Sequence, residues 1–386
     1  MSPASLHQSL TDLLLPRREE ALAMLHHLVE IQSGSRNKPG LDHMAREMAR
    51  ILGEILPEVR IVPFADHGNM VLARTRAAAT GRPGTVLLGH MDTVFPADTH
   101  FRNYREDSDR AYGPGVYDMK GGLVVAVYAL KALAELGLLD NMPVTVLCNS
   151  DEEIGSPASR ALIEDTVRSA RAALVFEGGG PQGDVVTGRK GRTGLKLTVR
   201  GRAGHAAKGG AKASAIAELA AKIVAMEGLN KDDVTVNVGL ISGGIGPNTV
   251  PDLATAEIDV RFLTPASQTM VEAELARIAG ECTVPGTRGE LQAVSGRPPM
   301  PPTDGNRRLY LLARKQAQIL GYELPEELRS GVSDANFIAA LNVPVLDGLG
   351  PVGDLDHSDL EFIQKNTLME RAVLTAALLA CVDKDN

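Results

Sequence analysis

Apolar segments of two lengths alternate over roughly the first half of the chain, and this alternation constrains the fold more than any other feature. Residues 18–31 and 41–56 have the apolar spacing of amphipathic helices, and a long helix is predicted to begin near Met119. Strands that alternate with helices predict a three-layer α/β domain with a largely parallel sheet. The runs with the length and composition of strands are 59–63, 70–74, 85–89, 143–150 and 172–177.

The pattern changes near residue 184. Residues 194–201 alternate between apolar and polar, and a helical segment, two further strand-like runs and a helix from about Gln268 follow. This β-α-β-β-α order predicts an antiparallel sheet with two helices on one face, which is a ferredoxin-like α+β unit. A segment rich in Pro and Gly at 296–306 then leads back to alternating helix and strand, with 343–348 as a buried strand.

At 386 residues the chain is long enough for two domains. We therefore predict a discontinuous α/β domain formed by residues 1–188 and 300–386, interrupted by an inserted domain at 189–299. If both flanks of the insertion form one sheet, polar residues at its strand ends will converge, because open α/β sheets place their sites at the carboxyl ends of the strands.

Composition excludes several classes of protein. The formal net charge of -8 leaves no basic surface for nucleic acid, and no segment approaches the ~20 apolar residues of a membrane span. The apolar stretch near the N-terminus is too short and too interrupted for a signal peptide, so we expect a cytoplasmic protein. Cys148, Cys282 and Cys381 form no C-x-x-C pair, and we expect three reduced core residues.

Histidine and acidic residues stand where strand-like segments end. His90 follows the run 85–89, and Asp92 could accept the second ring N–H of His90, which would fix its tautomer. A surface histidine in a turn is the alternative. Asp118 lies in GPGVYDMKGG, at the predicted start of a helix, where an N-cap is the alternative to a metal ligand. The glycine pair at 121–122, which permits close backbone approach, favours the ligand.

Three consecutive acids, Asp151, Glu152 and Glu153, follow the strand-like run 143–150. Adjacent carboxylates repel one another unless a cation is close, and a solvated acidic turn is the alternative. Because neighbouring residues point in different directions, Glu153 could bind a metal while Glu152 faces the reacting water as a general base.

Two further residues complete a candidate ligand set. Glu177 ends another apolar run, and His357 lies in a helix-entry loop. The glycines after Glu177 match G-x-G-x-x-G, but a proline interrupts the match and no helix follows, so nucleotide binding is not expected. Two imidazoles and three carboxylates suit a pair of divalent metals with one shared carboxylate, and a spare acid beside them indicates metal-assisted hydrolysis. The candidate ligands are His90, Asp118, Glu153, Glu177 and His357.

The segments GHMDTVFP, GPGVYDMKGG, DEEIGS and GPVGDLDHS, in this order and spacing, resemble the two-zinc exopeptidase and amidohydrolase family. That family contains glutamate carboxypeptidase, aminoacylase, acetylornithine deacetylase and succinyl-diaminopimelate desuccinylase. The resemblance covers nearly the whole chain, and the motifs are specific only when taken together. It implies two divalent metal ions, zinc in the first place with cobalt or manganese as alternatives.

The resemblance also implies a role for each candidate ligand. Asp118 would bridge both metals, His90 and Glu177 would complete one site, and Glu153 and His357 would complete the other. Beside them, the family pattern implies two residues that bind no metal. Those are Glu152 as the general base and Asp92 as the partner that orients the ring of the first histidine.

In the inserted domain, the resemblance implies a lid that also forms a homodimer. His205 matches a histidine that reaches the substrate carbonyl across the dimer, and Asn248 and Arg261 match positions that bind substrate near its carboxylate. From the residues alone, Arg261 in an ordinary strand would be interpreted as part of a surface salt bridge. Gly331 and Ser333 lie in a segment that matches a loop on the substrate side.

The expected reaction is hydrolysis of the amide bond in a small peptide or N-acyl amino acid that carries a free carboxylate. The resemblance favours the glutamate carboxypeptidase branch, with an N-acyl amino acid deacylase as the alternative. A binding protein that kept the fold and lost the chemistry is the alternative of another class. We expect no nucleic-acid partner and no membrane partner.

Overall fold

The computed structural model describes residues 3–382, and contacts divide the chain into two compact units. Unit 1 contains Met1–Gly188, Pro302–Leu328 and Ser333–Asn386, and unit 2 contains Arg189–Pro301 and Arg329–Val332. No helix among the described residues is long and apolar enough to cross a membrane.

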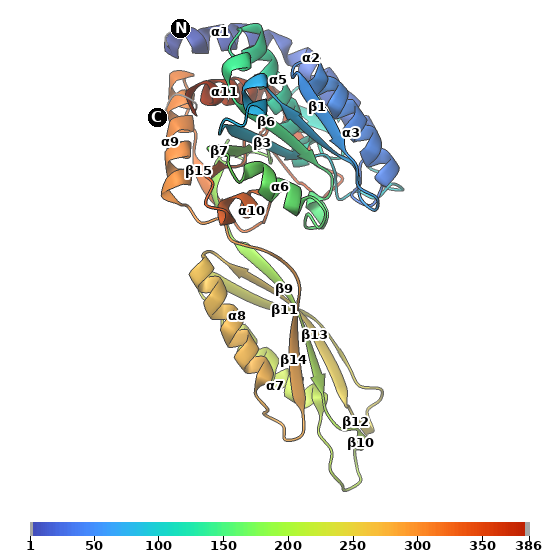
Figure 1. Cartoon of the computed structure of the whole chain (residues 1–386). Helices are drawn as coiled ribbons and strands as arrows, with labels where there is room; N and C mark the ends of the chain where they lie inside the picture. The colour runs from blue at the N-terminus through green and yellow to red at the C-terminus, as the bar shows by residue number, and fades with distance from the viewer. Residues whose placement is uncertain (1–2, 383–386) are drawn as a thin grey trace. The chain divides into compact units, whose positions relative to one another are not determined.

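A six-stranded mixed sheet forms the centre of unit 1, in the order β1-β2-β6-β3-β7-β16 (Figure 1). Strand β3 pairs in parallel with β6 and β7, and β7 pairs in parallel with β16, whereas β1 and β2 form an antiparallel edge. The sheet is therefore parallel in its central part. The strands are β1 (Glu58–Val62), β2 (Met70–Arg74), β3 (Thr85–His90), β6 (Val144–Asn149), β7 (Ala172–Val175) and β16 (Val345–Leu346).

Helices cover this sheet because its central strands are apolar on both faces, and every residue of β3 is buried. Leu87, Val146 and Leu174 on one face join a core to which α2, α5 and α11 contribute. The helices of unit 1 are α1 (Pro3–Leu14), α2 (Arg18–Glu30), α3 (Lys38–Gly53), α4 (Arg76–Ala79), α5 (Gly121–Glu135), α6 (Arg160–Val167), α9 (Asp304–Ile319), α10 (Ala335–Ala340) and α11 (Lys365–Val382).

Short strands frame the loops of unit 1. A four-stranded sheet has the order β17-β18-β5-β4, and β15 pairs with β8. These strands are β4 (Arg105–Glu106), β5 (Arg110–Tyr112), β8 (Val185–Arg189), β15 (Glu326–Arg329), β17 (Gly353–Asp354) and β18 (Phe362–Gln364). Residues 15–17, 139–141 and 152–154 form short 3-10 turns.

Unit 2 is a four-stranded antiparallel sheet in the order β11-β13-β9-β14, with two helices packed through an apolar cluster (Figure 1). Its chain order is βαββαβ, and three of these four strands were predicted from the sequence. Strand β14 was not predicted, because the segment RGELQAVSGR is largely polar and exposed. The elements are β9 (Gly191–Arg200), β10 (Gly204–His205), α7 (Ala215–Glu227), β11 (Val234–Gly243), β12 (Thr249–Val250), β13 (Leu253–Phe262), α8 (Pro265–Gly280) and β14 (Arg288–Arg297).

The long helix expected near Met119 is present and begins two residues later, at Gly121. A π-helical turn at Val116–Lys120, with non-helical backbone at Asp118 and Met119, precedes it. The expectation of three core cysteines was wrong: no disulfide joins them within residues 3–382, but only Cys148 is fully buried, whereas Cys282 is exposed in the loop after α8.

Candidate metal centre

Parallel pairing brings the ends of three strands of unit 1 to one edge of the sheet. His90 is the last residue of β3 and lies opposite Asn149 at the end of β6. The acidic turn at 151–153 follows β6 directly, and Glu177 follows β7 on the other side of β3. This arrangement places His90 between the two acidic segments.

Asp118 lies between two histidines from distant parts of the chain. Its Oδ1 is 3.0 Å from His90 Nε2, and its Oδ2 is 3.2 Å from His357 Nε2. Glu177 Oε1 lies 3.8 Å from His90 Nε2, and Glu153 Oε2 lies 3.3 Å from His357 Nε2. The five candidate ligands therefore lie in two groups, two candidate half-sites that would share the carboxylate of Asp118.

The donor atoms fit a pair of divalent cations. Nitrogen and carboxylate oxygen are ligands that zinc, cobalt and manganese accept. Glu153 Oε1 is buried, and no hydrogen-bond partner for it exists among residues 3–382. A buried carboxylate oxygen without a partner is costly unless a cation satisfies it. Two dications would also offset the repulsion among three carboxylates.

Asp356 is an additional candidate that the sequence analysis did not name. Ligand atoms of His90, Asp118 and Glu177 all lie within 4.8 Å of one another, and the same holds for Asp118, Asp356 and His357. Asp356 is exposed, whereas Glu153 is partly buried and has the orphaned oxygen. Glu153 therefore stays the predicted ligand of the second half-site, with Asp356 as a further candidate.

Electrostatics in the cluster show how strongly these groups depend on one another. Burial disfavours ionised Asp118, but hydrogen bonds from His357 and His90 outweigh it and lower the pKa of that carboxyl. Hydrogen bonds to Asp118 and Glu153 raise the pKa of His357 to about 11. Burial and the charge of Asp118 raise the pKa of Glu153 to about 8 and that of Glu177 well above its usual value. Without bound cations, the raised pKa values mean that protons neutralise part of the negative charge of the cluster. Bound metal ions would take over that neutralisation.

Asp92 connects the histidine of one half-site to the acidic turn. His90 Nδ1 lies 3.0 Å from the backbone carbonyl oxygen of Asp92 and 3.4 Å from its Oδ1. Oδ1 also accepts the backbone N–H of Glu152, and Oδ2 accepts the N–H of Glu153 and the hydroxyl of Ser35. The side chain is fully buried. Asp92 can thus hold both the imidazole and the backbone of the acidic turn, which is a wider role than orienting the ring alone.

Glu361 is a residue near the centre that the sequence analysis missed. It is fully buried, and its carboxylate accepts the backbone N–H groups of Gly115, Tyr117 and Asp118. Since Glu361 lies four residues after His357, it ties the loop of the shared carboxylate to the loop of the second histidine. Burial raises the pKa of Glu361 to about 8 against the opposing effect of these hydrogen bonds.

We expect Glu361→Gln to weaken zinc binding by about 10–100-fold, which is typical for loss of a group that supports metal ligands. The amide nitrogen cannot accept an N–H, so at least one of the three backbone donors would lose its partner. Competition with a chromogenic chelator would measure the affinity. Asp359→Asn, two residues away and exposed, is the control. Equal zinc affinity in both variants would contradict this role.

The candidate residues of unit 2 lie in two separate places. His205 and Asn248 are exposed neighbours, because β10 pairs with β12 and the Ala206 N–H donates to the Asn248 carbonyl. Strand β13 begins at Leu253, shortly after the strand β12 that pairs with His205. Arg261 lies near the other end of β13, roughly 25 Å along the strand at about 3.3 Å per residue. One unit 2 therefore does not bring His205 and Arg261 together.

Arg261 and the loop at 329–332 contact each other within unit 2. The guanidinium donates to Asp259 Oδ2 at 2.8 Å and to the Ser330 carbonyl at 2.9 Å, and Arg189 donates to the Gly331 carbonyl. The ion pair that the residues alone suggested for Arg261 is therefore present.

Ser333, the other candidate of this loop, belongs to unit 1. It is buried, and its hydroxyl donates to Asp347 Oδ2 at 2.8 Å. The hydroxyl thus has a partner inside the protein, and its expected contact with substrate stays a prediction.

The fold and the paired half-sites define the class of this protein, which is a metal-dependent hydrolase that acts on peptide or amide bonds. The sequence profile of Peptidase family M20/M25/M40 matches residues 86–380, and the chain belongs to this family. The expected resemblance is confirmed.

Named relatives are similar to this chain in sequence, and solved structures share its fold. Carboxypeptidase G2 of Pseudomonas sp. (strain RS-16) is 28% identical, over 97% of this chain and 91% of the relative. Acetylornithine deacetylase of Myxococcus xanthus is 32% identical over 45% of this chain and 48% of its own length. Among structures, aminopeptidase PepT of Bacillus cereus ATCC 10987 superposes with a TM-score of 0.79 at 21% identity, covering 95% of this chain and 99% of that one. YXEP of Bacillus subtilis, described as a dinuclear metal binding peptidase, has a TM-score of 0.72 at 16% identity, covering 96% and 99%.

Proposed function

We propose that this protein is a dizinc metallopeptidase that removes a C-terminal amino acid, glutamate in the first place, from a small peptide or acylated amino acid. The observation that carries the dinuclear site is the position of Asp118, whose two oxygens face two different imidazoles. The preference for a carboxypeptidase reaction is supported by the similarity to carboxypeptidase G2 over nearly the whole chain.

His90, Asp118 and Glu177 would hold one metal, and Asp118, Glu153 and His357 would hold the other. When bound, the metals would lower the pKa of water and polarise the substrate carbonyl. Cobalt or manganese could take the place of zinc with the same donor set.

Glu152 accepts a proton from the attacking water and delivers it to the leaving amine. Its backbone N–H is held by Asp92 Oδ1. Its charge contributes to the raised pKa values of both Glu153 and Glu177, which places its carboxylate within electrostatic reach of both half-sites. Arg261 would bind the free carboxylate of the substrate. Its guanidinium would then donate to that carboxylate instead of to Asp259, so it would keep an acidic partner.

The protein would act as a homodimer through unit 2, with His205 and Asn248 reaching substrate in the partner's active site. This arrangement is supported by the separation of His205 from Arg261 along β13, since a small substrate cannot span roughly 25 Å. His205 is exposed in the single chain. A residue that reaches into the active site of another subunit has to be exposed in this way.

We expect His205→Ala to lower kcat by about 10²–10³-fold with no loss of metal, the usual cost of removing one donor to a developing oxyanion. Mixing this variant with Glu152→Gln tests the route across the dimer. Heterodimers would contain one complete site if His205 acts in the partner, and activity would return. No recovery in heterodimers shown by native mass spectrometry would exclude it. His43→Ala, an exposed histidine of unit 1, is the control.

A substrate panel tests the reaction itself. The zinc-loaded protein would be given N-acyl peptides that end in glutamate, and separately N-acetyl and N-succinyl amino acids. Faster release of glutamate supports the carboxypeptidase, whereas faster loss of the acyl group from the simple amino acids supports the deacylase. If two metals bind and no amide is cleaved, the protein is a binding protein of this fold.

A further inference from the structure

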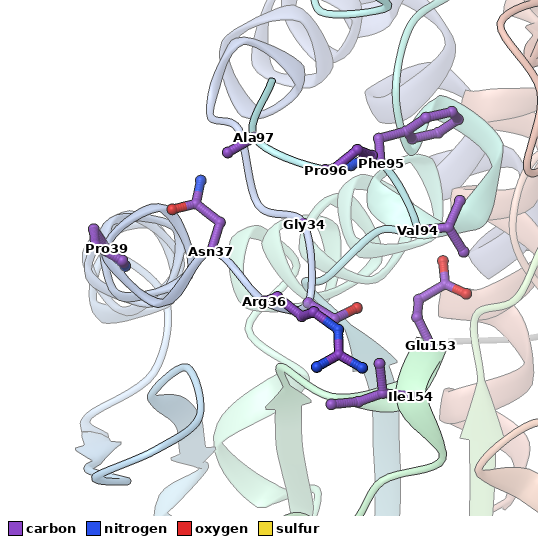
Figure 2. Close-up of a pocket in the computed structure, with 11 residues that line it drawn as sticks. Gly34, Arg36, Asn37, Pro39, Val94, Phe95, Pro96, Ala97, Glu153 and Ile154 are labelled. Atoms are coloured by element: carbon purple, nitrogen blue, oxygen red, sulfur yellow. The ribbon is translucent and has the colours of Figure 1, made fainter. Parts of the chain in front are cut away.

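A cavity of about 400 Å³ adjoins the metal centre at Glu153 (Figure 2). Its walls come from three segments of unit 1: residues 34–39, which lead into α3, residues 94–97, which follow β3, and Glu153 with Ile154. A volume of this size holds part of a small substrate. Because one wall is a candidate metal ligand, a group in this cavity would lie beside the bond to be cleaved.

Much of the wall is apolar. Val94 and Ile154 are each 38% exposed, and Phe95 and Pro96 continue the same surface (Figure 2). Apolar side chains left open beside a metal centre favour the aliphatic part of a substrate.

Among residues 3–382, each polar side chain of the wall except Arg36 has at least one partner, although Oε1 of Glu153 has none. Ser35 donates its hydroxyl to Asp92, and Asn37 uses its amide to bind the Gln32 carbonyl and the Gly40 N–H. Arg36 is exposed, and within residues 3–382 its guanidinium makes no hydrogen bond or ion pair. Figure 2 shows the Arg36 side chain extending toward Ile154.

The backbone around Arg36 is fixed against the segment that follows β3. The Ser35 N–H donates to the Thr93 carbonyl at 3.1 Å, and the Thr93 N–H donates to the Ser33 carbonyl at 3.0 Å. A Cβ on Gly34 would lie 2.1 Å from the Phe95 carbonyl oxygen, so the two segments touch as closely as glycine allows. Arg36 is therefore carried on a supported segment.

We propose that this cavity receives a second carboxylate of the substrate and that Arg36 binds it. The inference rests on the proposed function and narrows it to substrates that carry a second carboxylate besides the free carboxylate already proposed. A guanidinium presents paired N–H donors that match a carboxylate, and the apolar wall accommodates the short methylene chain before it. The second carboxylate belongs either to the side chain of the leaving residue or to the acyl group.

Two pairs of substrates distinguish these sources. N-acetyl-Ala-Glu against N-acetyl-Ala-Gln varies the side chain, and N-succinyl-Ala against N-butyryl-Ala varies the acyl group. We expect the wild type to cleave the acidic member of one pair with a higher kcat/KM than the neutral member. Arg36→Gln should lower this acidic-to-neutral ratio of kcat/KM by about 5–10-fold, the usual effect of losing one exposed charge-assisted contact. Arg36→Glu should lower it further. The control is Arg46→Gln, an exposed arginine on α3.

Unchanged ratios for both pairs in both Arg36 variants would overturn the inference, even if every substrate is cleaved. If the zinc-loaded wild type cleaves no substrate, the proposed function fails. Binding of glutarate and of butyrate, measured by calorimetry, would then test the carboxylate site by itself. Tighter binding of glutarate than of butyrate that Arg36→Gln removes would support the site. Equal binding of the two acids would refute it.

Discussion

Glu152→Gln is expected to lower kcat by about 10²–10⁴-fold while both metals stay bound, because the variant removes a general base and no ligand. The side chain is partly buried and its backbone N–H remains held by Asp92, so the amide should fit with little disturbance. Steady-state kinetics on the fastest substrate of the panel, together with metal analysis by mass spectrometry, would measure both quantities.

The control for this variant is Glu54→Gln, which removes an exposed acid at the end of α3. It should retain full activity and full metal content. A Glu152→Gln protein with normal kcat would refute the assigned base. Loss of metal from Glu152→Gln would instead make Glu152 a ligand and require a different base.

Asp118→Asn is expected to reduce bound metal from two ions per chain to one or none. Each oxygen of Asp118 faces a different imidazole, and an amide keeps only one acceptor oxygen and no charge. The metals supply several kcal/mol of transition-state stabilisation, so their loss should lower kcat/KM by roughly 10³-fold or more. Titration with zinc, followed by metal analysis of the dialysed protein, would give the stoichiometry.

Asp165→Asn, an exposed aspartate at the end of α6, serves as the matched control. Two tightly bound ions and wild-type rates in Asp118→Asn would show that no carboxylate is shared there. A single tight ion with partial activity would identify the half-site that carries the reaction.

Several features of the centre could be predicted because they depend on residue type and local order. His90 and the acids at 151–153 directly follow apolar strands, and neighbouring parallel strands end at the same edge of a sheet. Glu177 follows in the same way after β7. These candidate ligands were therefore readable from local patterns, and the family motifs added His357.

Local patterns failed where a residue acts through distant partners. Glu361 accepts N–H groups from residues more than 240 positions away, and no spacing in its own segment signals that contact. Asp118 was expected at a helix start, but its backbone has φ -117° and ψ 89° inside a turn that Glu361 holds. Strand β14 also lacked a signal, because a polar edge strand shows no buried face.

The sequence by itself indicated which side chains could bind metal and which acid could act as the general base, and it determined the order of α/β and antiparallel segments. Only the tertiary structure decided that the oxygens of Asp118 divide between His90 and His357. It also placed Arg36, which has no hydrogen bond or ion pair within residues 3–382, in the wall of the same cavity as Glu153. The physical reason is that a strand or helix arises from periodicity over a few residues, whereas contact between side chains depends on how those elements pack. Packing sums many weak apolar contacts across the whole chain, and no short segment records it.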